Sequence, residues 1–273
     1  TFFLSDVQAG CQLLASPIAP DFWRAPVDND RGNELPRVSG VWRQAGASFA
    51  PREVRAERVG PAQVRVTATG VLAATGAAYA LAYTVYGSGD VVVDATYDAG
   101  AARLPELPRF GLRTELASGL DQLSWYGPGP EETYADRRGL RVGLHASDVE
   151  AQFFGYSQPQ ESGNHADARW VALTGEGDVG LLAAGSPFLG ANASRFAAHD
   201  VESAAHPHEL TPRPGVVLNL DLAQRGVGGD DSWGALPHPE FRLTASTYRH
   251  RVRLRPFDAV TESPVVLGRQ RLP

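Results

Sequence analysis

The stretch YALAYTVYGSGDVVVDATY, residues 79–97, decides the fold of this chain. Apolar and aromatic side chains occupy every second position on both sides of the sequence GSGD, residues 87–90. Successive side chains of a β-strand point to opposite faces of a sheet, so each half predicts a strand with one buried face. A short glycine-rich connection of this kind is typical of a β-hairpin. The stretch therefore predicts two neighbouring antiparallel strands.

The same period of two recurs along the chain. It appears in residues 64–68, 110–116, 218–222 and 248–254. The last of these runs alternates with arginines, which predicts a strand that buries one face and holds a row of guanidinium groups in water. The 29 Gly and 20 Pro residues interrupt the runs at short intervals. We expect an all-β fold, a large antiparallel two-sheet sandwich with at most short helices, as one domain spanning residues 1–273.

One helical pattern interrupts the strands. Val38, Val41, Trp42 and Ala45 are spaced i, i+3, i+4, i+7, and Gly46 follows them. This spacing predicts an amphipathic helix that ends at the glycine.

Composition excludes several classes of function. The chain has 273 residues, 43% of them hydrophobic, and a net charge of −6. All 25 basic residues are Arg and no run of five or more occurs, so the electrostatic footprint of a nucleic-acid-binding protein is missing. No apolar stretch approaches the roughly 20 residues that span a bilayer, and no signal-peptide pattern opens the chain. We expect a cytoplasmic protein with no nucleic-acid and no membrane partner.

Cysteine and methionine usage adds two expectations. The single cysteine, Cys11, excludes an internal disulfide and is expected to be a small buried hydrophobe. A metal site is not expected, because there is no Cys cluster and His206 and His208 form a lone pair. The sequence has no Met and opens on Thr1, which indicates a domain excised or processed from a larger parent protein.

Four segments have a composition that fits neither strands nor ordinary turns, because each mixes aromatic, acidic, Arg and Gly or Pro residues. They are residues 21–32 (DFWRAPVDNDRG), 125–137 (WYGPGPEETYADR), 158–165 (QPQESGNH, running on to Arg169 and Trp170) and 226–234 (GVGGDDSWG). The mixture suits sugar recognition, since a pyranose offers an apolar C–H face to an aromatic ring and hydroxyls to planar polar groups. It equally suits a structural role, in which buried Asp–Arg pairs and Trp–carbonyl hydrogen bonds lock loops to the sandwich.

The fourth segment favours function. Its glycines permit a tight backbone with positive φ, which predicts that Trp233 sits at a loop tip and contacts a ligand. Asp230 and Asp231 are expected beside it, hydrogen-bonding nearby backbone. Packing of Trp233 into the core is the alternative.

A second candidate follows the first segment. Gly32, Asn33 and Glu34 open the segment of residues 32–40, which has no strand period. We hypothesise a mobile loop that acts as a partial lid over the sugar site. An ordinary exposed surface loop is the alternative.

The chain is not expected to be a hydrolase by itself. Retaining glycosidases need two carboxyl groups about 5 Å apart. Asp230 and Asp231 are sequence neighbours, as are Glu131 and Glu132, and neighbouring side chains of an extended chain point to opposite faces. Distant residues such as Glu161 and Asp230 could still converge. We expect no catalytic residue here.

These four segments, in this order, resemble the C-terminal, small-chain domain of glycoside hydrolase family 2 β-galactosidases. The matching residues are Phe22-Trp23-Arg24-Ala25-Pro26, Asp28-Asn29-Asp30, Gly127-Pro128-Gly129-Pro130-Glu131, Tyr134, Asp136-Arg137, Pro159-Gln160-Glu161, Gly163, Arg169-Trp170 and Gly228-Gly229-Asp230-Asp231-Ser232-Trp233. The resemblance covers essentially the whole chain. The sequence departs from the pattern at Ala135, where the family commonly has Pro, and at His165, where it often has Arg.

The resemblance implies a galactose-mutarotase-like supersandwich and a parent enzyme that hydrolyses terminal β-galactosides with retention. It implies that the two catalytic glutamates lie in a central barrel domain absent from this chain. Trp233 falls on the position of an aromatic group near the aglycone subsite. The implied partners are the barrel domain and a galactoside substrate, in a parent that is a homo-oligomer. No cofactor is expected in this chain, and any Mg or Na of the parent belongs to other domains.

Other classes of function stay open. A free-standing carbohydrate-binding module or an aldose 1-epimerase-like protein would share this fold. An epimerase needs a His acid and a carboxylate base that face one sugar. His206 and His208 are candidates, whereas His250 lies on a predicted buried face. A purely structural oligomerisation domain would bury Trp233.

Overall fold

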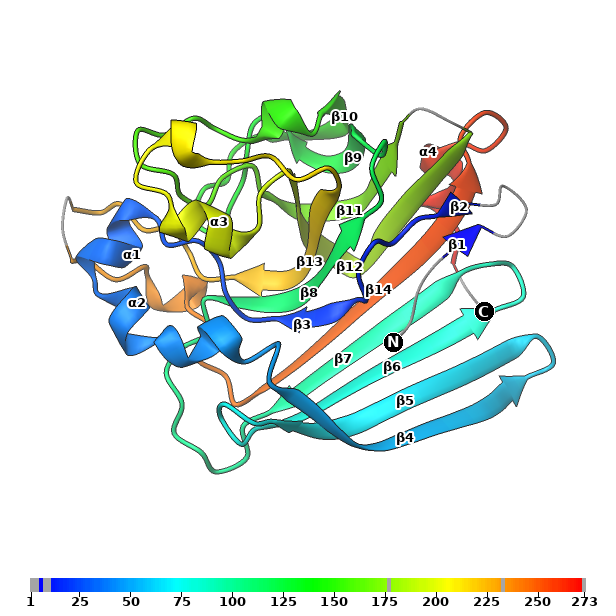
Figure 1. The fold of residues 1–273 in the computed structure, drawn as a ribbon, viewed down its shortest axis with the longest axis horizontal. Helices are drawn as coiled ribbons and strands as arrows, with labels where there is room; N and C mark the ends of the chain where they lie inside the picture. Colours follow the sequence, from blue (N-terminus) through cyan, green and yellow to red (C-terminus); the bar gives the residue numbers. More distant parts are fainter. Residues whose placement is uncertain (1–4, 7–10, 176–177, 232–233, 272–273) are drawn as a thin grey trace.

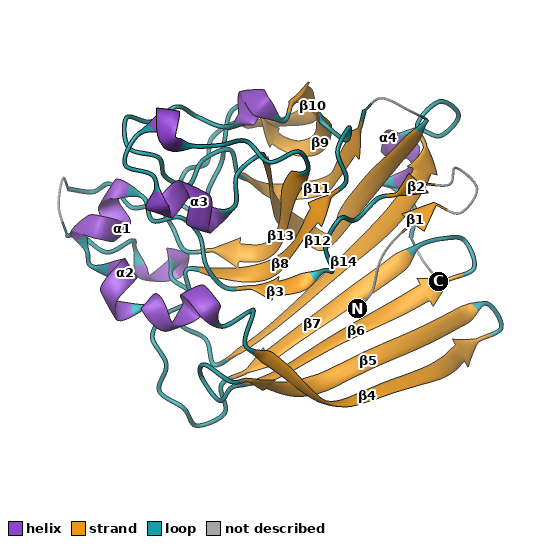
Figure 2. Ribbon diagram, viewed as in Figure 1, coloured by secondary structure: helices purple, strands orange, loops and turns teal. Residues whose placement is uncertain are grey.

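The computed structural model describes residues 5–6, 11–175, 178–231 and 234–271, and this part of the chain is built mainly of β-strands (Figures 1 and 2). The strands are β1 (Ser5–Asp6), β2 (Cys11–Gln12), β3 (Ala19–Asp21), β4 (Phe49–Gly60), β5 (Gln63–Leu72), β6 (Ala78–Tyr86), β7 (Val91–Asp98), β8 (Arg109–Leu116), β9 (Gln122–Gly129), β10 (Arg141–Asp148), β11 (His165–Thr174), β12 (Val179–Ser194), β13 (Val216–Gln224) and β14 (Thr247–Asp258). The helices are α1 (Asp28–Gly32), α2 (Leu35–Val38), α3 (Ala198–Ser203) and α4 (Pro264–Leu267), with 3₁₀ turns η1 (Gly40–Gln44), η2 (Glu150–Gln152), η3 (Pro207–Glu209) and η4 (Pro239–Phe241). None of the helices in these ranges is long and apolar enough to cross a membrane.

β1 and β2 pair only with each other, and the other twelve described strands form two layers that share β12. The main sheet runs in the order β10-β9-β11-β12-β14-β7-β6-β5-β4, and its neighbouring strands are antiparallel. The first half of β12 pairs with β14, and its second half pairs with β13. From β13 the pairing continues to β8 and then to β3, and these strands lie in front of the main sheet (Figure 1). β14, near the end of the chain, therefore occupies the middle of the main sheet between β7 and β12.

The core fills the space between the two layers. Leu112 of β8 and Leu220 of β13 lie beside Val93 of β7 and Val252 of β14, and all of them are buried. The predicted hairpin is confirmed, because residues 87–90 connect the paired strands β6 and β7. The apolar positions predicted for its inner face are buried: Tyr79, Leu81, Tyr83, Val91, Val93, Ala95 and Tyr97. The predicted all-β antiparallel fold with short helices is confirmed.

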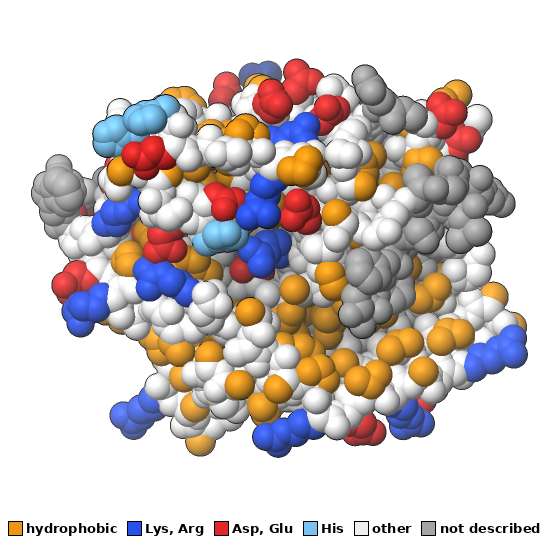
Figure 3. Space-filling view, viewed as in Figure 1, with side chains coloured by type: hydrophobic (Ala, Val, Ile, Leu, Met, Phe, Trp, Pro, Cys, Tyr) orange, Lys and Arg blue, Asp and Glu red, His pale blue; other side chains and the backbone are white. Residues whose placement is uncertain are grey.

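The main sheet extends past the second layer at β4 and β5. Val54 is 65% exposed and Val64 is 45% exposed, although the strand register places both on the face that buries Leu81 and Tyr83 further along the sheet. Hydrophobic side chains gather over this lower part of the molecule in the space-filling view (Figure 3). The period of two in residues 64–68 thus marks a strand whose inner face the described residues leave partly open.

The predicted helix over Val38–Ala45 is wrong in its geometry. Helix α2 ends at Val38, and the following turn η1 is a 3₁₀ helix in which Ala45 N donates to Trp42 O at 3.2 Å. A 3₁₀ helix has three residues per turn, so residues i and i+3 share a face. Trp42 and Ala45 therefore share the buried face, whereas Val38 and Val41 share the exposed one. The Trp42 indole donates to Pro105 O at 3.2 Å, which secures the turn.

The predicted row of water-exposed arginines on β14 is half correct. Arg249 and Arg251 are exposed, but Arg253 is buried. The residues around and after α4 cover it, and its guanidinium donates to Gln270 O at 3.0 Å and to Leu267 O. A carbonyl-lined cover of this kind leaves no trace in the alternation of the strand itself.

Arg109, at the start of β8, organises a buried cluster of charges where the second layer begins. Its guanidinium nitrogens lie 3.1 Å from carboxylate oxygens of Asp21, Glu161 and Asp221, and its side chain is fully buried. Asp221 is paired across the ladder with Gly111, where a Cβ would come within 2.0 Å of Asp221 Oδ1. Glycine is therefore required opposite Asp221, so that the carboxylate can reach Arg109.

Burial dominates the titration of this cluster. It raises the pKa of Asp221 to about 7, and the opposing effect of Arg109 is smaller. Burial also raises the pKa of Glu161, again against the attraction of Arg109. Three carboxyl groups share one guanidinium, so the cluster favours keeping a proton near neutral pH.

The cluster predicts a pH-dependent stability. Because the pKa of Asp221 is about 7 in the folded state and about 3.9 in an unfolded chain, the folded state holds an extra proton between these values. The free energy of unfolding should therefore fall as pH rises from about 4 through about 7, by on the order of 2–4 kcal/mol from this group. Urea denaturation across this pH range should give a flatter profile for Asp221→Asn.

The matched control is Asp148→Asn, which changes an exposed carboxylate on β10. This variant should keep the pH profile of the wild-type chain. Equal slopes for Asp221→Asn and the wild type would contradict the assignment.

Candidate functional site

The four segments singled out in the sequence meet at the end of the molecule that carries α1 (Figure 1). They are residues 21–32, 125–137, 158–170 and 226–234, and we call their meeting point the four-segment junction. The junction is held by side chains of the first three segments, which hydrogen-bond one another and the backbone of the fourth segment, so these polar residues have a structural role.

Arg24 ties the first segment to the fourth. Its guanidinium contacts both carboxylate oxygens of Asp30, at 3.0 and 3.1 Å, and both side chains are fully buried. It also donates to the carbonyls of Arg225 at 2.5 Å and Gly226 at 3.0 Å. Arg225 returns the contact, because its guanidinium lies 2.7 Å from Asp30 Oδ1. One carboxylate thus holds two buried arginines from distant parts of the chain.

Asp136 ties the second segment to the fourth. Its two carboxylate oxygens accept from Val227 N at 2.9 Å and Gly228 N at 2.8 Å. A Cβ on Gly226 would lie 2.4 Å from Asp136 Oδ2, so this glycine is required by close approach. Gly228 has a φ of 72°, in the left-handed region that favours glycine. The start of the fourth segment is therefore held firmly.

The third segment is bonded to the first segment and to the second. The Gln160 amide pairs with Asp28, accepting from its backbone N–H and donating to its carboxylate, each at 3.2 Å. Asn164 exchanges two hydrogen bonds with the backbone of Thr133, at 2.7 and 2.8 Å. Glu132 accepts from Gly163 N at 2.8 Å.

The predicted sugar-contact residues are Trp233, Asp230 and Asp231. Trp233 and Ser232 lie outside the described residues. Asp231 accepts from Ala235 N at 3.1 Å, and exposed Asp230 contacts the His238 ring. The hydrogen bond to Asp230 raises the pKa of His238.

The segment proposed as a lid lies beside the fourth segment. Asn33 donates to Ala235 O at 3.4 Å, and a Cβ on Gly234 would lie 3.9 Å from Gly32 O. Glu34 is exposed, has a φ of 60° and pairs with Arg37 at 2.5 Å. Residues 35–38 of this segment form the short helix α2. The lid role itself stays a prediction.

The carboxylates that do converge do not form an open catalytic pair. Asp21, Glu161 and Asp221 meet around Arg109 and are buried or nearly so. Asp230, by contrast, is exposed and bonded to His238. The three buried groups are committed to an ion-pair cluster rather than to a substrate.

The histidines considered for epimerase chemistry are placed differently from one another. His250 is buried, contacts Leu220 O at 3.2 Å, and burial lowers its pKa to about 4. His206 and His208 lie together on the exposed turn η3, with ring centroids 5.5 Å apart. Among the described residues, no group of three His, Cys, Asp or Glu side chains is arranged to hold a metal ion.

Three residues that support the junction, Glu106, Arg225 and Arg242, have no sequence feature that marks them. Glu106 binds Arg225 at 3.0 Å and Arg242 at 2.6 Å, and so extends the buried network around Asp30. None of these residues lies in a segment of unusual composition. Their partners are 119 and 136 positions from Glu106 in the sequence, so only the fold brings them together.

Comparisons of the sequence with known proteins agree on one family. The family model described as "Beta galactosidase small chain" matches residues 3–254. A β-galactosidase of Priestia megaterium (strain DSM 319 / IMG 1521) is 35% identical over 259 residues, which are 93% of this chain and 25% of that protein. A β-galactosidase of Halalkalibacterium halodurans is 38% identical over 243 residues, which are 87% of this chain and 24% of that protein. The chain thus spans about a quarter of the length of these relatives.

Similar solved structures are more remote. An aldose epimerase homologue from C. elegans matches with a TM-score of 0.40 and 9% identity, over 76% of this chain and 69% of that one. The galactosidase domain of an α-galactosidase-sucrose kinase matches with a TM-score of 0.42 and 9% identity, over 90% and 28%. At these scores neither likeness bears on function. The family model and the sequence relatives decide the matter: this chain belongs to the β-galactosidase small chain family.

Proposed function

We propose that this chain is the part of a β-galactosidase that completes the sugar site from outside the catalytic domain, through Trp233. The observation that carries the proposal is the anchoring of the fourth segment by Asp136, Arg24 and Asn29, the last donating to Val227 O at 2.9 Å. A loop held this firmly costs little further entropy when it orders an aromatic side chain against a ligand. The apolar C–H face of a pyranose or its aglycone is the partner such a ring takes.

The parent activity we propose is retaining hydrolysis of terminal β-D-galactosides. In this scheme the acid and nucleophile glutamates come from a barrel domain that partners this chain, in a homo-oligomeric enzyme. The name β-galactosidase belongs to the whole of each relative, and this chain spans about a quarter of each relative's length. The buried state of Asp21, Glu161 and Asp221 supports a division of labour, because retaining chemistry needs two accessible carboxyl groups about 5 Å apart.

We propose in addition that residues 32–40 act as a partial lid. Asn33 donates to the backbone carbonyl of Ala235, so a movement of this segment would shift the residue that directly follows the fourth segment. Closure over a bound sugar would exclude water from the site.

The first prediction about the proposed activity concerns the chain alone. Because its converging carboxylates are bound to Arg109, the 273-residue chain should not hydrolyse a chromogenic β-galactoside. Release of the chromophore, followed by absorbance, should equal that of buffer. Turnover that survives repurification and disappears when an acidic residue of this chain is replaced would overturn the division of labour.

The second prediction concerns Trp233 in the protein that carries the barrel. Loss of an aromatic stack should cost on the order of 1–2 kcal/mol, or roughly five- to thirtyfold in affinity. The contact exists before bond cleavage, so Trp233→Ala should raise KM more than it lowers kcat. Steady-state kinetics with a galactoside measure both constants. Trp233→Phe keeps an aromatic ring, so its KM should lie between the KM of the wild type and that of Trp233→Ala. An unchanged KM for Trp233→Ala would rule out the contact.

The third prediction tests the anchor. Asp136→Ala leaves two backbone N–H groups without their acceptor and should loosen the fourth segment, so KM should rise in the direction of Trp233→Ala. The double variant should be less than additive, because both changes act on one contact.

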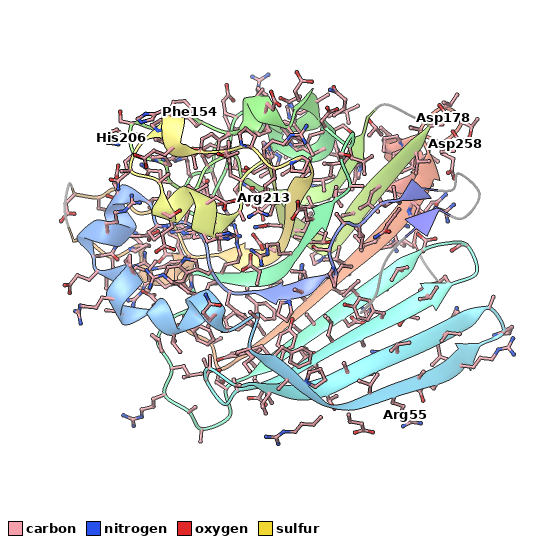
Figure 4. All side chains as sticks on the ribbon, in the orientation of Figure 1. Arg55, Phe154, Asp178, His206, Arg213 and Asp258 are labelled. Atoms are coloured by element: carbon pink, nitrogen blue, oxygen red, sulfur yellow. The ribbon has the colours of Figure 1, made fainter. Side chains whose placement is uncertain are left out.

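Asp258→Ala is the matched control for the anchor. Asp258 also accepts from two backbone N–H groups, those of Val260 at 2.8 Å and Thr261 at 3.0 Å. It lies at the opposite end of the molecule (Figure 4). This variant should leave KM unchanged, and an equal effect of both substitutions would show that the anchor acts only through stability.

A further inference from the structure

A hollow lies beside the four-segment junction. It has a volume of about 700 Å³, within the range of small-molecule sites. The second segment lines one wall, and the stretch of residues 151–156 lines the other. Neither the fold nor the proposed contact at Trp233 makes use of it.

The second wall presents an aromatic surface. Phe153 turns inward against Phe196, with ring centroids 4.8 Å apart in an edge-on arrangement. The next residue, Phe154, points outward and is 60% exposed (Figure 4). Its ring lies 4.6 Å from the ring of Tyr156. Two adjacent rings facing a hollow offer an apolar surface that a ligand could cover.

This aromatic wall is held in place from behind. Phe154 N donates to the hydroxyl of Ser162 at 3.2 Å, and Ser162 is buried. Tyr156 N donates to Phe154 O at 2.9 Å, and the Tyr156 hydroxyl contacts Glu132 Oε1 at 3.4 Å. The exposed rings therefore stand on a backbone fixed by neighbouring hydrogen bonds, which lowers the entropy cost of binding.

The first wall is polar but balanced in charge. It contributes Glu131, Glu132, Arg137 and Arg138, two acids and two arginines. Glu132 and Arg137 pair at 2.6 Å, and half of the Arg137 side chain remains exposed, with N–H groups available to a ligand. A balanced set of planar donors and acceptors favours a neutral polar ligand over an anion or a cation.

We propose that this hollow, lined by Phe154, Tyr156, Glu132 and Arg137, is a second carbohydrate site that binds a neutral hexopyranoside of one or two rings. The apolar C–H face of the sugar lies against the two aromatic rings, and its hydroxyls bond the carboxylate and guanidinium groups opposite. The assignment of the ligand class also rests on the proposed function. None of the described residues that line the site belongs to the fourth segment.

The test is a titration of the chain with methyl β-D-galactopyranoside and with lactose, followed by ligand-observed and amide NMR. The wild-type chain should show saturable binding. Phe154→Ala should weaken it about three- to tenfold, and Phe154→Tyr should restore it. Phe188→Ala is the matched control, because Phe188 is another exposed ring, 41% accessible, which lies on β12 and does not line the hollow. It should bind as the wild type does.

Trp233→Ala separates this proposal from the proposed function. If Trp233→Ala abolishes binding and Phe154→Ala does not, the sugar occupies the fourth segment and the second site is overturned. If Phe154→Ala weakens binding while Trp233→Ala leaves both binding and KM unchanged, the second site stands and the Trp233 contact falls. Absence of saturable binding to the wild-type chain, or equal affinity in Phe154→Ala, overturns the second site.

Discussion

Asp30 bridges two buried arginines, Arg24 and Arg225, and the whole end of the molecule that carries the candidate site depends on this contact. A charge removed from water is tolerated only when it is paired and hydrogen-bonded, and breaking such a pair typically costs 3–5 kcal/mol. Arg24 belongs to the first segment, and Arg225, whose carbonyl Arg24 also binds, directly precedes the fourth segment. Pairing these charges therefore fixes the relative position of loops that no strand ladder connects, and sugar recognition is proposed for the loops so fixed.

Period-two alternation was sufficient to predict strands at residues 64–68, 79–97, 110–116, 218–222 and 248–254, because burial on one face and solvent on the other is what a two-layer sheet imposes. It did not mark β9 or β11, whose residues 125–129 and 165–170 lie in segments with a composition typical of neither strands nor ordinary turns. It was not sufficient where a second shell of polypeptide covers the outer face. Arg253 reads as a surface residue, yet carbonyls beyond α4 bury it. The spacing of Val38 and Trp42 fits an α-helix, but α2 ends at Val38 and Trp42 lies in the separate 3₁₀ turn η1, so Val38 is exposed while Trp42 is buried.

The segments that form the candidate site could be predicted from their composition, but the contacts between them could not. Unusual mixtures of Trp, Asp, Arg and Gly marked all four segments, and these segments do meet. Which residue binds which could not be inferred, since Glu106 and Arg225 are 119 positions apart and lie in no unusual segment. The aromatic wall at Phe154 was also missed, because one exposed ring in a loop has no distinguishing pattern around it. The position of Trp233 stays a prediction.

The central position of β14 has a consequence for biosynthesis. Its partners β7 and β12 are both made earlier, and each keeps an open hydrogen-bonding edge until residues 247–258 leave the ribosome. Unpaired edges of long, apolar strands are templates for pairing with other chains. In this chain, a translation product that stops before residues 247–258 therefore has two open strand edges in its main sheet, rather than only a shorter sequence.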